Sequence, residues 1–163
     1  MKIAFLDRDG TINKDYPDTE WAYIKNPEVL PGAIEGMSEL LARGYEIIII
    51  TNQYTIGEKF ITLEQYQNFT NKLLTILNGN SVRVLDIFYC PHARSDNCDC
   101  CKPRTGLIEK ALVKYPDINL NESFMCGDSV SDMECAEQMG LAFYGIGIGK
   151  RQVKNLLDLC SMV

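Results

Sequence analysis

Two carboxylates separated by a single residue stand near the start of the chain, in the segment Asp-Arg-Asp-Gly-Thr at residues 7–11. A carboxylate such as Asp7 can attack phosphorus and carry the phosphoryl group covalently. A second carboxyl group beside it, Asp9, can protonate the leaving oxygen and then activate water. Gly10 allows the sharp turn or close backbone approach that such a site needs. A solvated acidic turn has the same composition, so this segment alone leaves both interpretations open.

Three later positions offer groups that suit the same chemistry. Thr51 and Asn52 present a hydroxyl and amides to phosphate oxygens. Lys102 is a cation that can offset the charge of a transferring phosphoryl group. Asp128 supplies another carboxylate, which together with Asp7 can bind Mg²⁺, a hard ion that prefers oxygen ligands. Each of these residues also has an ordinary reading, as a strand end or as solvated surface.

Asp132 is open to two interpretations. It follows Asp128 by four residues, at a distance that suits a carboxylate supporting the metal site. It also lies near the expected start of a helix, where an acidic side chain is stabilised by the helix dipole. We expect the capping box of that helix to be formed by Ser131 and Glu134, because a Ser followed three residues later by Glu is typical of a helix start.

The only histidine of the chain lies among clustered cysteines, with three thiols and the imidazole falling within eleven residues. These four ligand candidates are Cys90, His92, Cys98 and Cys100. They form the ligand set of a closed tetrahedral zinc site, which has no open position and is therefore structural. We expect the zinc loop, residues 90–101, to brace the position of Lys102. A group of reduced thiols with a chance histidine is the alternative, and Cys101 competes as a ligand.

The elements that must position these groups alternate between strand and helix. Four consecutive isoleucines at 47–50 indicate a strand buried on both faces, as in a parallel sheet. Ligands of such sheets sit at the carboxyl ends of the strands, which is where the polar groups above fall. The sequence thus predicts a parallel α/β sheet with helices on both faces. Strands are expected at 2–6, 45–51, 84–89, 123–126 and 141–146, and helices at 33–43, 62–77, 106–114, 131–140 and 153–159.

Length and composition fit one domain spanning residues 1–163. Hydrophobic residues make up 46% of the chain and charged residues 23%, which is typical of a globular protein. The net charge of −6 disfavours a general nucleic-acid binder. The longest aliphatic run, 47–50, is far shorter than the ~20 residues of a membrane span, and no export signal is visible. We therefore expect a cytoplasmic monomer that contacts neither nucleic acid nor membrane.

The order Asp-x-Asp-Gly-Thr, Thr-Asn, Lys-Pro and Gly-Asp-x-x-x-Asp resembles the four motifs of the haloacid dehalogenase superfamily over nearly the whole chain. The resemblance implies a Rossmann-like fold, here without a separate cap domain, and phosphatase activity. It assigns Asp7 as nucleophile and Asp9 as general acid and base. By the same resemblance Asp132 supports the site. Mg²⁺ would be held by Asp7, the main-chain carbonyl of Asp9 and Asp128, and the phosphoryl group by Thr51 and Lys102.

The sequence Cys-Pro-His, a spacer, Cys-Asp-Cys and Lys-Pro resembles the zinc-containing phosphatases of the D-glycero-D-manno-heptose 1,7-bisphosphate type and the related histidinol-phosphatase domains. This resemblance implies a small phosphate ester as substrate. Heptose bisphosphate is the first candidate and histidinol phosphate the alternative, while a catalytically silent phosphate-binding module is the non-enzyme alternative. The residues implied to face substrate are Asp15, Asn52, Gln53 and Lys102.

Four positions depart from the heptose-enzyme pattern and leave the substrate less defined than the reaction. Cations or small residues are common at these positions, which here hold Tyr54, Glu58, Cys101 and Ser129. Cysteine cannot replace the bidentate phosphate binding of arginine. Cations that can compensate are Lys59, Arg104, Lys150 and Arg151.

Overall fold

Six parallel strands form one sheet at the centre of the protein, in a computed structural model that describes all of residues 1–163. The strand order is β3-β2-β1-β4-β5-β6, and every neighbouring pair is parallel. This is the doubly wound, Rossmann-like order, which agrees with the predicted fold class. The strands are β1 (Ile3–Leu6), β2 (Glu46–Asn52), β3 (Asp86–Cys90), β4 (Phe124–Gly127), β5 (Ala142–Ile146) and β6 (Gln152–Val153).

Alternate residues of the central strands feed two separate cores. In β2, Ile47 and Ile49 join one buried cluster, while Ile48 and Ile50 join the other. All four isoleucines are fully buried, so the absence of polar alternation in the sequence reflects a strand covered on both faces. The prediction made from this run is confirmed.

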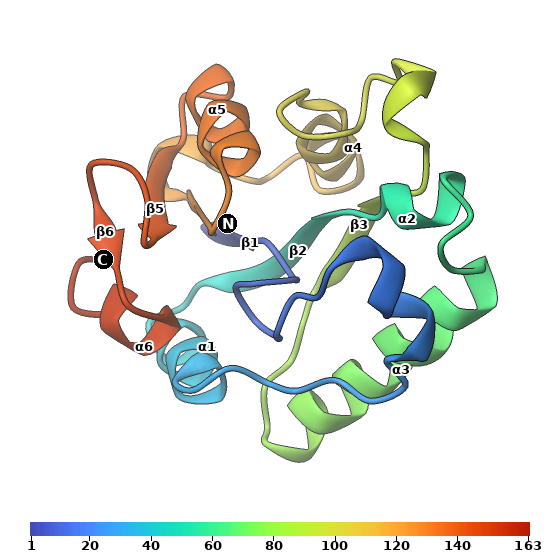
Figure 1. Cartoon of the computed structure of the whole chain (residues 1–163). Coiled ribbons are helices and arrows are strands. Elements are labelled where there is room, and N and C mark those ends of the chain that lie inside the picture. The colour runs from blue at the N-terminus through green and yellow to red at the C-terminus, as the bar shows by residue number, and fades with distance from the viewer.

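Helices cover the two faces of the sheet, as Figure 1 shows. On one side lie α1 (Ala33–Ala42), α3 (Leu63–Gly79) and α6 (Leu156–Leu159), which contribute to the first cluster. On the other side lie α4 (Gly106–Lys114) and α5 (Val130–Gln138). None of the helices has the length and apolar character required to cross a membrane.

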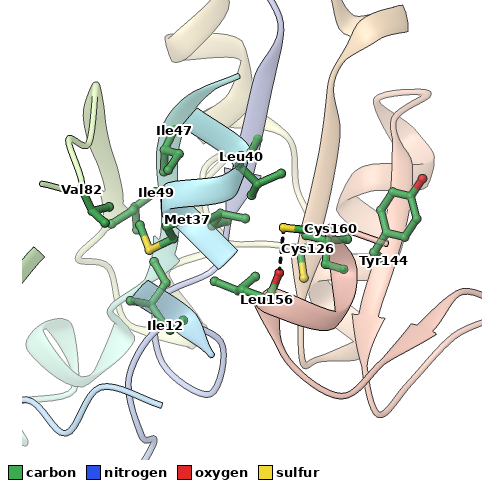
Figure 2. Close-up of a cluster of buried hydrophobic side chains, with 14 of the residues drawn as sticks. Ile12, Met37, Leu40, Ile47, Ile49, Val82, Cys126, Tyr144, Leu156 and Cys160 are labelled. Carbon is green, nitrogen blue, oxygen red and sulfur yellow. Dashed lines mark hydrogen bonds between the residues drawn. The ribbon is translucent and has the colours of Figure 1, made fainter. Parts of the chain in front are cut away.

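The first core joins α1, α6 and the strands between them (Figure 2). Met37 and Leu40 of α1 lie against the isoleucines of β2. Cys160, at the end of α6, donates its thiol to the carbonyl of Leu156 at 3.4 Å. This packing holds the C-terminal end of the chain against the sheet. The carboxyl edge of the strands stays free to build a site.

Three local features differ from the sequence prediction. Helix α5 begins at Val130, and its capping box is formed by Ser129 and Asp132 rather than by Ser131 and Glu134. Both pairs fit the spacing of the motif, so the pattern alone could not choose between them. Strand β6 and the short α2 (Tyr54–Gly57) were not predicted, because elements of two and four residues are too short to show periodicity.

Candidate active site

Strands β1 and β2, the first turn of α5 and the loop of Lys102 bring a buried ionic cluster together at the carboxyl edge of the sheet. Lys102 lies with its Nζ 2.7 Å from Oδ1 of Asp7 and 2.6 Å from Oδ1 of Asp132. The same ammonium donates to the carbonyl oxygen of Ile50 at 2.7 Å. Asp7 follows β1 directly, and its backbone N–H donates to the carbonyl of Cys126 in β4 at 2.9 Å. Asp7 and Lys102, which the sequence assigned to the same phosphoryl-transfer site, are therefore in direct contact.

Burial dominates the electrostatics of the cluster. It raises the pKa of Asp7 well above its usual range, although the charge of Lys102 opposes this shift. For Lys102, burial works against the charged form, but Asp132 and Asp7 outweigh it and raise the pKa of the ammonium. Burial and the charge of Asp132 raise the pKa of Asp128 to about 6. The cluster holds the carboxylates of Asp7, Asp128 and Asp132 but only one ammonium, that of Lys102. An additional cation would therefore stabilise the ionised forms of these carboxylates.

Oxygen atoms of Asp7, Asp128 and Asp132 lie within 4.8 Å of one another, close enough to share a metal ion. Asp132 is already engaged, because Oδ1 accepts from Lys102 and Oδ2 accepts from the backbone N–H and hydroxyl of Ser129 at 3.1 and 2.7 Å. Asp7 and Asp128 are therefore the side chains that fit Mg²⁺, which prefers carboxylate oxygens and retains several waters. Asp132 lies in the first turn of α5, as its helix-start interpretation expected, and its contact with Lys102 is compatible with the supporting role that the resemblance implies.

Asp9 lies beside this cluster but its carboxylate is held elsewhere. Its oxygens accept hydrogen bonds from Arg8 Nε at 2.8 Å and Nη2 at 3.0 Å. They also accept from Asn13 Nδ2 and from Gln53 Nε2, each at 2.9 Å. The resemblance gave Asp9 a metal role only through its main-chain carbonyl, and the side chain indeed stands outside the group of metal-competent carboxylates.

The two amide side chains at the end of β2 have protein partners that the sequence did not reveal. Asn52 donates to the carbonyl of Lys102 at 3.0 Å and accepts from its backbone N–H at 2.8 Å, so its side chain clamps the main chain of Lys102. Gln53 donates to Thr51 Oγ1 at 2.9 Å as well as to Asp9. Both amides also line the pocket. No pattern in the sequence signals such contacts, because they join residues 44 and 50 positions apart.

The predicted zinc ligands converge on one point. Their ligand atoms lie within 4.8 Å of one another, and the group is Cys90, His92, Cys98 and Cys100. Sγ of Cys100 lies 3.1 Å from Sγ of Cys90, 3.2 Å from Nδ1 of His92 and 3.7 Å from Sγ of Cys98. Ligands of tetrahedral zinc are separated by about 3.6–3.8 Å, so these ligand atoms are at or slightly inside the spacing at which the four would hold a zinc ion. Cys101 does not belong to the group, and its side chain is buried in the second core.

A cavity of about 250 Å³ opens onto the cluster of Asp7, Lys102 and Asp128. The sequence-predicted residues that line it are Asp7, Asp9, Asp15, Thr51, Asn52, Gln53, Lys102 and Asp128, joined by Asp18, Trp21, Tyr54, Thr55, Ser129 and Ser131. Lys102 is thus the only lysine or arginine in a lining rich in carboxylates. None of the four compensating cations expected from the sequence lines the cavity.

At the rim, Tyr54 joins the pocket to an exposed ionic network. Its hydroxyl donates to Asp18 Oδ1 at 3.0 Å, and the guanidinium of Arg94 lies 4.0 Å from the centre of its ring. Arg94 in turn donates to both oxygens of Glu58 at 2.8 Å. No sequence pattern marks Arg94, because its place depends on the folding of the loop of residues 90–101 over α2.

A parallel sheet of this order, with paired carboxylates after β1, an aspartate after β4 and a lysine that contacts Asp7 and Asp132, is the arrangement of the haloacid dehalogenase phosphatases. The polynucleotide kinase 3 phosphatase family model matches residues 2–145, and the chain belongs to this family of the superfamily. It is accordingly a phosphatase that hydrolyses phosphate esters. The recognition made from the motifs is confirmed.

Several similar proteins carry names that refer to heptose 1,7-bisphosphate. A probable D-glycero-D-manno-heptose-1,7-bisphosphate 7-phosphatase of Thermoplasma volcanium is 37% identical over 147 residues, covering 88% of this chain and 97% of the relative. The D-glycero-alpha-D-manno-heptose-1,7-bisphosphate 7-phosphatase of Photorhabdus laumondii is 39% identical over 148 residues, covering 86% and 79%. The crystal structure of D,D-heptose 1,7-bisphosphate phosphatase from B. bronchiseptica, complexed with magnesium and phosphate, superposes with a TM-score of 0.87. That chain is 27% identical, with 99% of this chain and 97% of the other covered.

Proposed function

We propose that the protein is a Mg²⁺-dependent phosphatase of small sugar phosphates, with D-glycero-D-manno-heptose 1,7-bisphosphate as its substrate. The observation that carries this proposal is the contact between Lys102 and Asp7 at 2.7 Å, inside a pocket that Asp128 also lines. Phosphoryl transfer depends on positioning and charge neutralisation, and this cluster supplies both. The names of the relatives favour the heptose ester over histidinol phosphate.

The reaction proceeds in two steps. Asp7 attacks phosphorus while Asp9 gives a proton to the leaving oxygen, which produces a phospho-aspartyl enzyme. Water that gives its proton to Asp9 then hydrolyses this intermediate. Lys102 orients the Asp7 carboxylate through Oδ1, and the hydroxyl of Thr51 lines the cavity where the phosphoryl group binds. Magnesium bound at Asp7, the Asp9 carbonyl and Asp128 would neutralise the repulsion between two anionic reactants.

The zinc site supports this chemistry from the adjoining loop. Cys100 precedes Lys102 by two residues, so the position of the ligand constrains that of the lysine. The side chain of Asn52 fixes the same main chain from β2. Zinc held by four protein ligands has no open position for substrate, and its contribution is therefore structural.

The remaining parts of the proposal concern the working form of the protein. One domain, residues 1–163, acts without a separate cap, and the loop that carries Asp15, Asp18 and Trp21 lines the pocket instead. We propose that it acts in the cytoplasm as a monomer on small-molecule esters. The acidic net charge of −6 and the thiol ligands, which require a reducing compartment, support this part.

Hydrolysis assays with the purified protein test the proposal. Release of phosphate is measured from 4-nitrophenyl phosphate, heptose 1,7-bisphosphate and histidinol phosphate, each with and without Mg²⁺. We expect Mg²⁺-dependent turnover, with the highest kcat/KM on the heptose ester. Phosphate binding without turnover of any ester would favour the catalytically silent module instead.

A further inference from the structure

Arg8 stands between the two carboxylates of the first motif, yet it is 1% exposed and does not line the pocket. Its guanidinium carbon lies 4.9 Å from the ring centre of Phe69, 5.4 Å from Tyr66 and 5.8 Å from Trp21. Its Nη1 donates to Thr70 Oγ1 at 3.1 Å. Three aromatic rings and one hydroxyl therefore hold this side chain in a single orientation behind the active site.

The other edge of the guanidinium grips the carboxylate of Asp9. Nε donates to Oδ1 at 2.8 Å and Nη2 donates to Oδ2 at 3.0 Å, which is the two-pronged geometry of a strong arginine–carboxylate pair. A buried ion pair contributes little net stability compared with apolar residues of similar volume. A gain in stability is therefore not a sufficient reason for an arginine at this buried position. The orientation that Arg8 imposes on the Asp9 carboxylate explains the residue better.

The remaining donors show which oxygen of Asp9 serves the pocket. Asn13 Nδ2 donates to Oδ1, and Gln53 Nε2 donates to Oδ2. Of the residues that donate to Asp9, Gln53 alone lines the cavity. The same Gln53 nitrogen has a second acceptor in Thr51 Oγ1 at 2.9 Å, so it retains a partner when it leaves Asp9. The position that Gln53 occupies beside Oδ2 is therefore the approach open to a substrate oxygen.

We infer that Arg8 is a positioning residue, which fixes the plane of the Asp9 carboxylate so that Oδ2 faces the leaving oxygen of the ester. This inference rests on the proposed function. In the first step, the proton on Oδ2 passes to the leaving oxygen as its bond to phosphorus breaks and the bond from Asp7 forms. In the second, a proton of water passes to Oδ2 as the water oxygen bonds to phosphorus and the bond to Asp7 breaks.

Single-turnover kinetics with enzyme in excess isolate the first step. Release of the leaving group is measured from heptose 1,7-bisphosphate, an alkyl ester whose leaving oxygen needs a proton, and from 4-nitrophenyl phosphate, whose leaving group departs without one. In Arg8→Met we expect release from the heptose ester to slow by about 10–100-fold, since general acid catalysis contributes on the order of 10²–10⁴-fold. Release of 4-nitrophenol is expected to slow by less than about threefold, because it does not draw on that contribution.

The ratio of the two rates does not depend on the fraction of folded enzyme, so partial unfolding cannot imitate the expected result. Arg8→Lys keeps the charge but lacks the fork, and we expect it to show the same changed ratio. Thr70→Val removes only the third hydrogen bond of Arg8 and is expected to keep the wild-type ratio. A wild-type ratio in both Arg8 variants, or full restoration by lysine, overturns the inference. Wild-type protein inactive on both esters overturns the proposed function itself.

Discussion

A β-carbon added to Gly10 would lie 2.0 Å from Oδ2 of Asp128. The first of these residues belongs to the loop after β1, and the second follows β4, the neighbouring strand in the sheet. The chain leaves β1 toward β2 on one side while β4 lies on the other, so the two meet at the switch point where ligands of such sheets bind. The missing side chain at Gly10 is what lets the two motifs approach.

Gly10→Ala should therefore disable the metal site. The backbone of Gly10 has φ +90°, and the new methyl group would displace the Asp128 carboxylate. We expect kcat/KM to fall by about 100-fold or more and the Mg²⁺ requirement to rise, since misplacement by ~1 Å costs about 10²-fold. Titration of activity with Mg²⁺ measures this change. Gly147→Ala is the matched control, with φ +73° and no atom within 4 Å of the added carbon. Equal losses of activity in the two variants would show that the clash with Asp128 is not the cause of the loss in Gly10→Ala.

Lys102→Met should destabilise the protein as well as slow it. The substitution leaves Asp7 and Asp132 buried without their shared counter-ion, and breaking a buried pair costs about 3–5 kcal/mol. We expect a loss of this size in the free energy of unfolding in urea, and a smaller loss when Mg²⁺ is added. Lys114→Met serves as control, because its pair with Asp86 is at the surface and should leave stability close to that of wild type. A loss that Mg²⁺ does not reduce would count against metal binding near Asp7.

The proposed zinc ligands can be separated from the neighbouring thiol by matched substitutions. Cys98→Ser removes a member of the four-residue group that could hold a metal ion, whereas Cys101→Ser changes a cysteine outside it. We expect Cys98→Ser to lose zinc, to unfold at a lower temperature and to lose activity, while Cys101→Ser keeps its metal. Elemental analysis of the purified proteins measures the zinc content. A folded, active wild-type protein without zinc would refute the structural role.

Glu58→Gln should change the choice of substrate rather than the chemistry. Glu58 holds Arg94 through two hydrogen bonds of 2.8 Å at the pocket rim, and an exposed pair of this kind contributes little to stability. Release of Arg94 is expected to raise kcat/KM for a bisphosphate relative to its monophosphate by about two- to fivefold, the small effect expected of a solvent-screened charge. Arg94→Gln should shift the same ratio the other way. Identical ratios in both variants would exclude the rim network as a determinant of the second phosphate.

The parallel sheet was predictable because burial on both faces leaves a direct trace in composition. The isoleucines of β2 carried that signal, and the polar residues after β1, β2 and β4 marked the functional edge. The boundaries and caps of the helices were harder to predict from the sequence. Two pairs that begin with serine fitted the start of α5, and the structure, in which β4 ends at Gly127, has Ser129 as the cap.

The candidate site was predictable in its motif residues but not in their partners. Asp7, Asp128 and the proposed zinc ligands follow from residue type and order along the chain. The contacts of Arg8 could not be predicted, because Thr70 lies 62 residues away on a helix whose docking depends on the whole first loop. The same holds for the Asn52 clamp on Lys102, which exists only once β2 and the zinc loop lie side by side.

Chemical trapping of the covalent intermediate tests the nucleophile directly. The enzyme is mixed with 4-nitrophenyl phosphate and Mg²⁺, quenched during turnover, and reduced with borohydride, which converts a phospho-aspartyl residue to homoserine. Peptide mass spectrometry should then find homoserine at position 7, and Asp7→Asn should remain folded while losing both the product and the turnover. Homoserine at another position, or undiminished turnover by Asp7→Asn, would contradict the assignment of Asp7 as the residue that carries the phosphoryl group.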